Sequence, residues 1–115
     1  MKKVLVVDDE VAIREIVTLM LGGRYRIISA RDGREAVEKF KVFNPDFVIM
    51  DVMMPVMNGI EAIKAMKELN PGVKIIALTA YAEKRRNELI EAGAVEVLSK
   101  PFRRKDLVEA IQRHL

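Results

Sequence analysis

Residues 4–10 read Val-Leu-Val-Val-Asp-Asp-Glu, four apolar residues followed directly by three acids. An uninterrupted apolar run rich in β-branched valine is typical of a strand buried on both faces, as in a parallel sheet. The abrupt change to Asp8-Asp9-Glu10 predicts that the strand ends there, with carboxylates at its carboxyl end. We therefore predict an interior strand of an α/β sheet that leads into an acidic loop.

The rest of the chain repeats this alternation of a short apolar run with an amphipathic helix pattern. After the first strand, residues 11–21 place apolar side chains at helical spacing, and Gly22-Gly23 ends that helix. Further strands are predicted at 25–30, 47–50, 73–78 and 95–98, and further helices at 34–43, from Asn58-Gly59 to Asn70, at 83–92 and at 105–115. Five strands alternating with five helices imply parallel βαβ units with helices on both faces of one sheet.

The composition limits the class of protein. The chain has 115 residues, of which 50% are hydrophobic and 32% charged, with a formal net charge of +3 and no cysteine. This length suits a single domain, no apolar run reaches the roughly 18 residues of a membrane span, and the early charges predict no secretory signal. The absence of cysteine excludes thiol catalysis and thiolate metal sites, and the thin positive surplus favours a mixed surface over nucleic-acid binding. We expect a cytoplasmic domain that binds neither membrane nor nucleic acid.

Polar residues follow the predicted strands where each one ends. Asp8-Asp9-Glu10 follows the first, Asp51 the third, Thr79 the fourth and Ser99-Lys100-Pro101 the fifth. In a doubly wound sheet with strand order 2-1-3-4-5, the first and third strands are neighbours, and ligands bind beyond their carboxyl ends. Asp8, Asp9 and Asp51 would then share a pocket, where they repel one another unless a cation bridges them. Because only oxygen ligands are offered, we expect Mg²⁺.

Four stretches together resemble the signatures of the response-regulator receiver family. They are Val6-Val7-Asp8-Asp9-Glu10, Asp51-Val52-Met53-Met54-Pro55-Val56-Met57-Asn58-Gly59, Leu78-Thr79-Ala80 and Lys100-Pro101-Phe102. Their order and spacing match the family over the whole chain. The resemblance implies a flavodoxin-like (βα)5 fold over residues 1–115, as one receiver domain. It also implies a signalling protein, not an enzyme, that catalyses only its own phosphorylation and dephosphorylation and switches conformation to relay a signal.

The resemblance assigns the reacting groups. Asp51 matches the phosphoacceptor, which takes a phosphoryl group from a phosphohistidine on a sensor histidine kinase. Thr79 matches the hydroxyl that moves to the phosphoryl group, and Lys100 matches the ammonium that pairs with it. The Lys100-Pro101 bond matches the family's cis peptide. These roles suit the chemistry, because a carboxylate that attacks a charged phosphoryl group needs positive charge nearby.

The resemblance also assigns a Mg²⁺ site. Asp8 and Asp9 match the acidic metal pair, and Asp51 is the third carboxylate. Met53 matches the position whose backbone carbonyl completes the ligand set, so its side chain is irrelevant to that role. The neighbouring methionines are interpreted as packing residues, because thioethers do not suit hard cations.

Each of these residues also has an ordinary structural interpretation. The acids at 8–10 could cap the following helix, Thr79 could cap the next one, and Lys100 could be a solvated lysine. Among rival functions, a hydrolase of the haloacid dehalogenase type would have Asp-x-Asp instead of adjacent Asp8-Asp9. A flavodoxin would have a Gly/Ser/Thr-rich phosphate loop after the first strand. A degenerate receiver that only binds a partner would lack some of the site residues.

Partner recognition is predicted on the first helix and beside Lys100-Pro101. The helix at 11–21 has more apolar residues than one core-facing stripe needs. The candidates for kinase docking are Ile13, Ile16, Met20 and Phe102, together with Ala12, Glu15 and Arg103. A downstream phosphotransfer protein is a second candidate partner, and both a stand-alone receiver and part of a longer regulator remain open.

One position departs from the family pattern. Many receivers carry an aromatic residue three positions before the lysine, where this chain has Val97. A valine cannot swing between inward and outward poses as an aromatic ring does. We therefore expect switching to depend on the loop after Thr79 and on the polar helix at 83–92, which has few apolar anchors.

Overall fold

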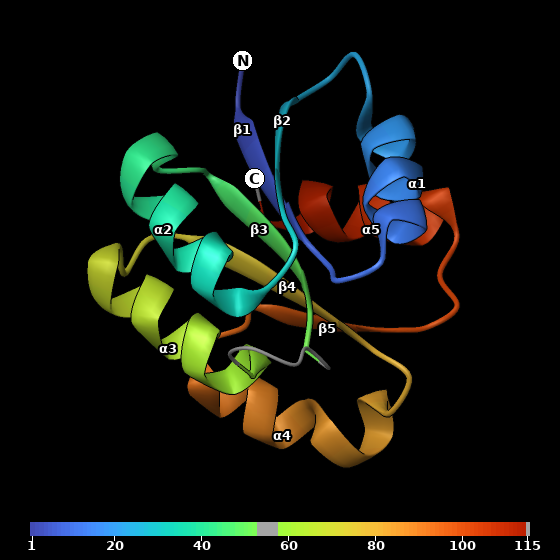
Figure 1. Cartoon of the computed structure of the whole chain (residues 1–115). Coiled ribbons are helices and arrows are strands. Elements are labelled where there is room, and N and C mark those ends of the chain that lie inside the picture. The colour runs from blue at the N-terminus through green and yellow to red at the C-terminus, as the bar shows by residue number, and fades with distance from the viewer. Residues whose placement is uncertain (53–57, 115) are drawn as a thin grey trace.

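The fold is a parallel five-stranded sheet between two layers of helices. The computed structural model describes residues 1–52 and 58–114. Its strands are β1 (Lys3–Val7), β2 (Arg26–Ala30), β3 (Phe47–Asp51), β4 (Lys74–Thr79) and β5 (Glu96–Ser99). They are all parallel and lie in the order β2-β1-β3-β4-β5 (Figure 1). The predicted doubly wound, flavodoxin-like fold and its strand order are confirmed.

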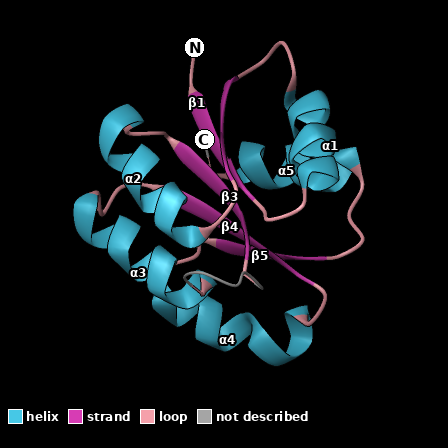
Figure 2. Cartoon of the chain, in the orientation of Figure 1, coloured by secondary structure: helices cyan, strands magenta, loops and turns pink. Residues whose placement is uncertain are grey.

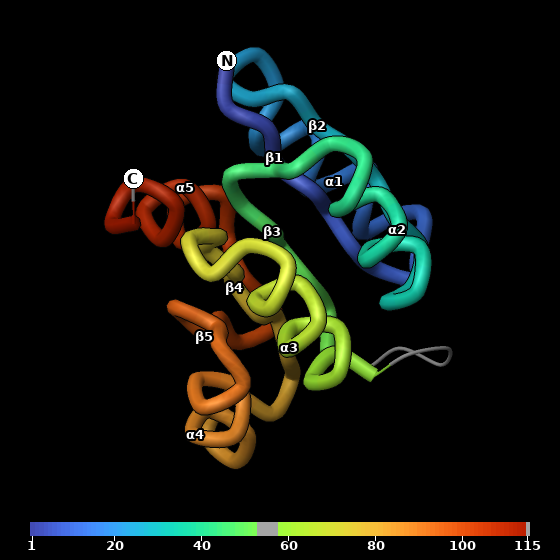
Figure 3. The backbone as a smooth tube through the Cα atoms, turned by 90° about the vertical axis from the view of Figure 1, so that its left-hand side faces the viewer, coloured from blue at the N-terminus to red at the C-terminus, as the bar shows by residue number. Residues whose placement is uncertain are grey.

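Five helices connect these strands. They are α1 (Val11–Leu21), α2 (Gly33–Phe43), α3 (Gly59–Leu69), α4 (Ala82–Ala92) and α5 (Arg104–Arg113). Helices α1 and α5 cover one face of the sheet, and α2, α3 and α4 cover the other (Figure 2). In the view turned by 90°, α2 and α3 lie in front of the sheet, toward the viewer (Figure 3). Among the described residues, no helix combines the length and the apolar character needed to cross a membrane.

The apolar run of β1 is explained by its place inside the sheet. Val4 and Val6 point into the hydrophobic cluster under α1 and α5, which we call the α1/α5 cluster. Leu5 and Val7 point into the cluster under α2, α3 and α4, which we call the α2–α4 cluster. All four side chains are almost fully buried. A strand whose two faces are both covered cannot alternate apolar with polar residues.

The start of α3 lies directly against the end of β3. Asn58 caps the helix, since its side chain accepts a hydrogen bond from the backbone N–H of Glu61 at 3.0 Å. Gly59 follows, and its backbone N–H donates to the carbonyl of Val52 at 3.3 Å. A Cβ at position 59 would lie 2.6 Å from the Cα of Val52, so only glycine fits without a shift of the backbone. The first turn of α3 is thereby held next to the strand that carries Asp51.

The structure refines the predicted element boundaries by a residue or two. Asp51 and Thr79 are the last residues of β3 and β4, so the backbone of each still belongs to the sheet. The last helix was predicted to reach residue 115, but α5 ends at Arg113, and residue 115 lies outside the described residues. Ile90, an apolar residue of the weakly amphipathic α4, is exposed rather than part of the core.

Candidate functional site

Polar side chains from four strands converge at the carboxyl edge of the sheet. Asp8 follows β1, Asp51 ends β3, Thr79 ends β4 and Lys100 follows β5. Among the described residues, the buried polar or charged ones are Asp8, Asp51 and Thr79, which are 1%, 5% and 0% exposed. The central strands of a parallel sheet place their carboxyl ends side by side, which explains why residues so far apart in the sequence meet here.

Lys100 lies between the two buried carboxylates. Its Nζ is 3.4 Å from Oδ2 of Asp51 and 3.6 Å from Oδ2 of Asp8. The backbone N–H of Lys100 donates to the Thr79 carbonyl at 2.9 Å, which ties the loop after β5 to the end of β4. The Lys100-Pro101 peptide bond is cis, as predicted. The interpretation of Lys100 as an ordinary solvated lysine therefore does not hold.

Asp8 is fixed by hydrogen bonds at three of its four polar atoms. Its backbone N–H donates to the Ala30 carbonyl at 3.1 Å, and its Oδ1 accepts from the Glu10 N–H at 2.9 Å. Its carbonyl accepts from Nη1 of Arg14 at 2.7 Å. Its buried Oδ2 accepts no hydrogen bond from any described residue. Burial raises the pKa of Asp8 to about 6, opposed by the Glu10 hydrogen bond and reinforced by the negative charge of Asp51.

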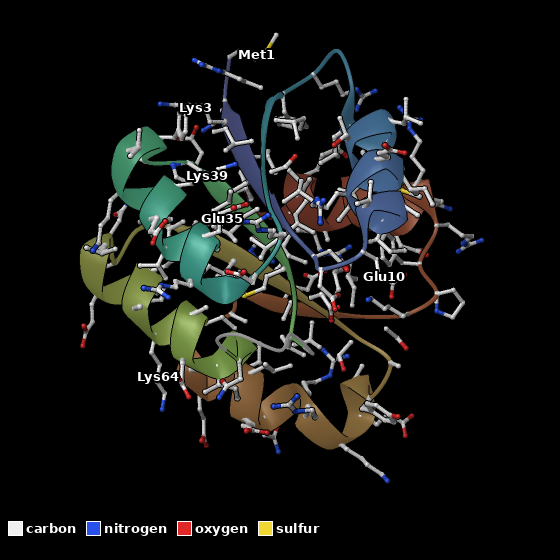
Figure 4. The ribbon with its side chains drawn as sticks, viewed as in Figure 1. Met1, Lys3, Glu10, Glu35, Lys39 and Lys64 are labelled. Atoms are coloured by element: carbon white, nitrogen blue, oxygen red, sulfur yellow. The ribbon has the colours of Figure 1, made fainter. Side chains whose placement is uncertain are left out.

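The acidic loop can supply a cation with oxygen ligands. One carboxylate oxygen each from Asp8, Asp9 and Glu10 lie within 4.8 Å of one another. Asp9 and Glu10 are exposed, and Glu10 lies at the entry to α1 (Figure 4). An all-oxygen set with one buried, unsatisfied carboxylate oxygen suits a hard divalent cation such as Mg²⁺. Met53 lies outside the described residues.

The alternative role of these residues as helix caps is only partly supported. Glu10 occupies the capping position of α1, but its side chain makes no capping hydrogen bond. The Thr79 hydroxyl accepts a hydrogen bond from the backbone N–H of Tyr81 at 3.0 Å, just before α4 begins. Thr79 therefore supports the entry to α4, and its hydroxyl already has a partner in this state.

Four of the seven residues predicted to dock a partner come together in space. Ile13, Ile16, Met20 and Phe102 line a cavity of about 360 Å³, together with Lys100 and Pro101. Ile16 is 45% exposed, whereas the other three are partly buried against the α1/α5 cluster. The cavity thus joins an apolar surface on α1 to the lysine of the site.

Two features of α1 were not predicted from the sequence. One is the contact between Arg14 and the carbonyl of Asp8. The other is the exposure of Val11 and Leu19, which border a second hollow of about 510 Å³ between α1 and Ser29 of β2. The surplus of apolar residues on α1 could have indicated that some of them, such as Val11 and Leu19, are exposed. The hydrogen bond from the Arg14 guanidinium to a backbone carbonyl could not have been predicted from the sequence pattern.

Known proteins share the features of this chain along its whole length. The family model of the response regulator receiver domain matches residues 4–112. Chemotaxis protein CheY of Thermotoga maritima is 41% identical over 115 residues, which cover 97% of this chain and 96% of that protein. CheY of Halobacterium salinarum is 38% identical over 112 residues, covering 96% and 93%.

Solved structures agree with the sequence comparison. CheY4 of Vibrio cholerae superposes with a TM-score of 0.93 at 38% identity, covering 100% of this chain and 99% of that one. TrrA, a response regulator of Thermotoga maritima solved in complex with Mg²⁺-BeF, superposes with a TM-score of 0.90 at 39% identity, covering 100% of both chains. Sequence, strand order and the convergence of aspartates and lysine lead to one family: the chain is a response-regulator receiver domain of two-component signalling.

Proposed function

We propose that residues 1–115 form one receiver domain that accepts a phosphoryl group on Asp51 from a phosphohistidine of a sensor kinase. The observation that carries this proposal is the position of Lys100 Nζ, 3.4 Å from Oδ2 of the buried Asp51. A buried carboxylate with an ammonium beside it has a counter-charge for the dianionic group that it would receive. Neither a helix cap nor a solvated lysine accounts for this pair.

The proposed transfer exchanges one bond to phosphorus for another. A carboxylate oxygen of Asp51 forms a bond to phosphorus, while the bond between phosphorus and the donor's imidazole nitrogen breaks and that nitrogen keeps the electron pair. Lys100 holds the carboxylate in place and then pairs with a phosphoryl oxygen. The Thr79 hydroxyl leaves the Tyr81 N–H and donates to another phosphoryl oxygen. Positioning and electrostatics do most of the work in such a transfer.

We propose that Asp8, Asp9 and Asp51, with the backbone carbonyl of Met53, hold Mg²⁺. The Oδ2 of Asp8, which accepts no hydrogen bond from the described residues, and the cluster of Asp8 with Asp9 support this assignment. Bound Mg²⁺ would supply positive charge that offsets repulsion between the attacking carboxylate and the phosphoryl oxygens. TrrA, the Thermotoga maritima relative, was solved with Mg²⁺-BeF, which makes the same reagent a suitable probe here.

Beryllium fluoride binding tests the phosphoacceptor without a kinase. We expect wild type to bind the reagent in the presence of Mg²⁺ and to be labelled by a small acyl phosphate, and Asp51→Asn to do neither while remaining folded. The matched control is Asp46→Asn, since Asp46 lies at the amino-terminal ends of the strands, away from the site, where its carboxylate accepts from the Lys3 N–H. Labelling of Asp51→Asn at wild-type yield would refute the assignment.

We propose that the kinase docks over the cavity formed by Ile13, Ile16, Met20 and Phe102. An apolar surface beside a charged site suits a specific but transient interface. Ile16→Ala should slow transfer from the kinase about tenfold while labelling by acyl phosphate stays unchanged. Val42→Ala, an exposed apolar truncation on α2, is the control. Equal kinase-driven transfer in wild type and Ile16→Ala would place the docking surface elsewhere.

We also propose that the protein acts on no substrate besides its own aspartyl phosphate. The adjacent Asp8-Asp9 pair, rather than Asp-x-Asp, supports this over a hydrolase of the haloacid dehalogenase type. Steady release of phosphate from a phosphate ester, in excess of one equivalent of protein, would contradict the proposal.

A further inference from the structure

We propose that Arg14 is a positioning residue for the Mg²⁺ site, because its side chain fixes the peptide that joins Asp8 to Asp9. This inference rests on the proposed Mg²⁺ site. It assigns a role to an arginine that neither forms a hydrogen bond or ion pair with Asp51 nor belongs to the acidic cluster.

Arg14 holds the acidic loop at two points. Its Nη1 donates to the Asp8 carbonyl at 2.7 Å, and its backbone N–H donates to the Glu10 carbonyl at 3.2 Å. The bond at Asp8 is short and charge-assisted, which makes it stronger than a neutral hydrogen bond. The guanidinium therefore fixes the start of the three-residue acidic segment, whereas the backbone bond at its end is one that any residue at position 14 can make.

The geometry of the peptide bond gives this contact its consequence. The Asp8 carbonyl lies in the same rigid plane as the backbone nitrogen of Asp9. Fixing the carbonyl therefore fixes the direction in which the chain leaves Asp8 and hence the starting point of the Asp9 side chain. The Asp8 carboxylate is itself set by the Glu10 N–H at 2.9 Å. With both contacts in place, the Asp8 carboxylate is oriented and the Asp9 side chain has a fixed starting point before any cation arrives.

The surroundings of Arg14 favour this role over a purely structural one. Within the described part of the chain, the Asp8 carbonyl is the hydrogen-bond acceptor of its guanidinium, and no carboxylate forms a salt bridge with it. The side chain is partly buried and borders the hollow between α1 and β2. A partly desolvated guanidinium whose contact is a loop carbonyl next to a metal site acts on the geometry of that site.

Positioning and simple electrostatics predict opposite results when Arg14 is replaced. A positive charge near a cation site repels Mg²⁺, so its removal should tighten Mg²⁺ binding if charge were its main influence. If Arg14 orients the loop, its removal should weaken Mg²⁺ binding, since the carboxylates must then be ordered at the cost of binding free energy.

The test measures Mg²⁺ affinity by calorimetric titration of the apo protein. We expect Arg14→Met to weaken Mg²⁺ binding about tenfold, and Arg14→Lys to recover most of it, because an ammonium can still donate to the Asp8 carbonyl. Arg34→Met removes an exposed arginine that pairs with Glu38 on α2 and serves as the control for loss of one positive charge. Unchanged or tighter binding in Arg14→Met, or no recovery in Arg14→Lys, would overturn the proposal.

A second measurement needs no metal. In the apo protein, Arg14→Met should speed hydrogen exchange of the Glu10 amide severalfold, because the guanidinium no longer fixes the backbone of Asp8, whose carboxylate accepts from that amide. Arg14→Gln gives a polar replacement for the same comparison should the Met variant fold poorly. If wild type itself binds no Mg²⁺, the proposed metal site fails; if wild type binds and Arg14→Met binds equally, only the role of Arg14 fails.

Discussion

Asp8 has a carboxylate whose environment disfavours its charge. It is almost fully buried, it lies near Asp51, and its Oδ2 accepts no hydrogen bond from the described residues. The nearest positive charge, Lys100 Nζ, is 3.6 Å away and is shared with Asp51. A buried carboxylate whose negative charge lowers the stability of the protein is typical of a site where a ligand needs that charge.

Replacing Asp8 should therefore stabilise the apo protein. Its raised pKa means that the folded state holds the proton more tightly, so the contribution of Asp8 to stability falls as pH rises from about 4 to about 6 and stays low above that. Asp8→Asn keeps an acceptor for the Glu10 N–H but has no buried negative charge. We therefore expect its free energy of unfolding at pH 7 to exceed that of wild type by about 1–2 kcal/mol.

The measurement is urea unfolding of wild type and Asp8→Asn without divalent ions at pH 4 and pH 7. The gain should shrink toward zero at the lower pH. Asp9→Asn, which changes an exposed neighbour, is the control and should change stability little. An Asp8→Asn protein that is less stable than wild type at pH 7 would contradict the argument.

Most residues of the candidate site could be predicted because parallel strands bring their carboxyl ends together. That rule is enough to gather Asp8, Asp51, Thr79 and Lys100 from four distant segments. It does not tell which of two adjacent acids is buried, since Asp8 and Asp9 both follow the strand and only the path of the loop separates them. The Arg14 contact was not predictable for the same reason: it depends on where a loop carbonyl points.

At the scale of elements, Thr79 connects α4 to the site. Thr79 ends β4, and its hydroxyl holds the Tyr81 N–H at the entry to α4. Val97, where many relatives of the family have an aromatic residue, is buried in the α2–α4 cluster. If the Thr79 hydroxyl moves toward a phosphoryl group as proposed, we expect its hydrogen bond to the Tyr81 N–H to lengthen or break and the entry to α4 to change.

Thr79→Val should imitate the released state at this one hydrogen bond. We expect the Tyr81 amide to exchange with solvent about fivefold faster than in wild type, which corresponds to the loss of one ordinary hydrogen bond. Thr79→Ser keeps the hydroxyl and should exchange at close to the wild-type rate. Amide exchange followed by NMR distinguishes the three proteins, and equal rates in all of them would show that the bond does not control this loop.

An ion-pair cluster ties β5 to the end of α5. Glu96 contacts the guanidinium of Arg113 and lies 3.0 Å from Nε2 of His114. The hydrogen bond from Arg113 is the main reason that the pKa of Glu96 lies below its usual value. Because a lowered pKa favours the ionised form in the folded state, this cluster stabilises the protein above the unfolded-state pKa and is lost as pH falls through the folded-state value.

Glu96→Gln should cost about 0.5–1 kcal/mol at pH 7, a modest loss because Arg113 is half exposed. The difference from wild type should shrink as the pH falls from 7 to below the folded-state pKa of Glu96, where Glu96 is protonated in both states. Glu38→Gln, which breaks the exposed pair with Arg34 at 3.9 Å on α2, is the control. Urea unfolding at the two pH values measures both, and a difference that grew at low pH would contradict the pairing.

The elements themselves were largely predictable, since apolar runs and capping residues mark their limits. Asn58-Gly59 predicted the start of α3, and the structure shows the cap and the close approach to Val52. Which side of a helix is exposed was harder to predict. Ile90 and Leu19 are apolar but exposed. Their exposure was not predictable, because hydrophobicity alone does not say whether a side chain lies in the core or at a surface hollow.

At the scale of the whole molecule, Mg²⁺ should stabilise the fold by relieving the repulsion in the acidic loop. A ligand that binds only the folded state at one hundred times its Kd adds about 2.7 kcal/mol, which raises the Tm by about 8–14 °C for a domain of this size. Thermal unfolding with Mg²⁺, compared with sodium chloride at equal ionic strength, measures the effect. Asp9→Asn should lose most of the shift, and an equal shift in that variant would contradict the proposed ligand set.

The two hydrophobic clusters, one on each face of the sheet, have no described residue in common. Among the described residues, buried apolar side chains therefore give no continuous route of contacts from α1 to α4 through the interior. The strand ends are the place where both layers meet the same few atoms, since the loop beside α1 carries Asp8 while the loop before α4 begins at Thr79. We therefore expect substitutions on α1 that alter the proposed docking surface to leave the entry to α4 unaffected, as long as the residues at the strand ends are kept.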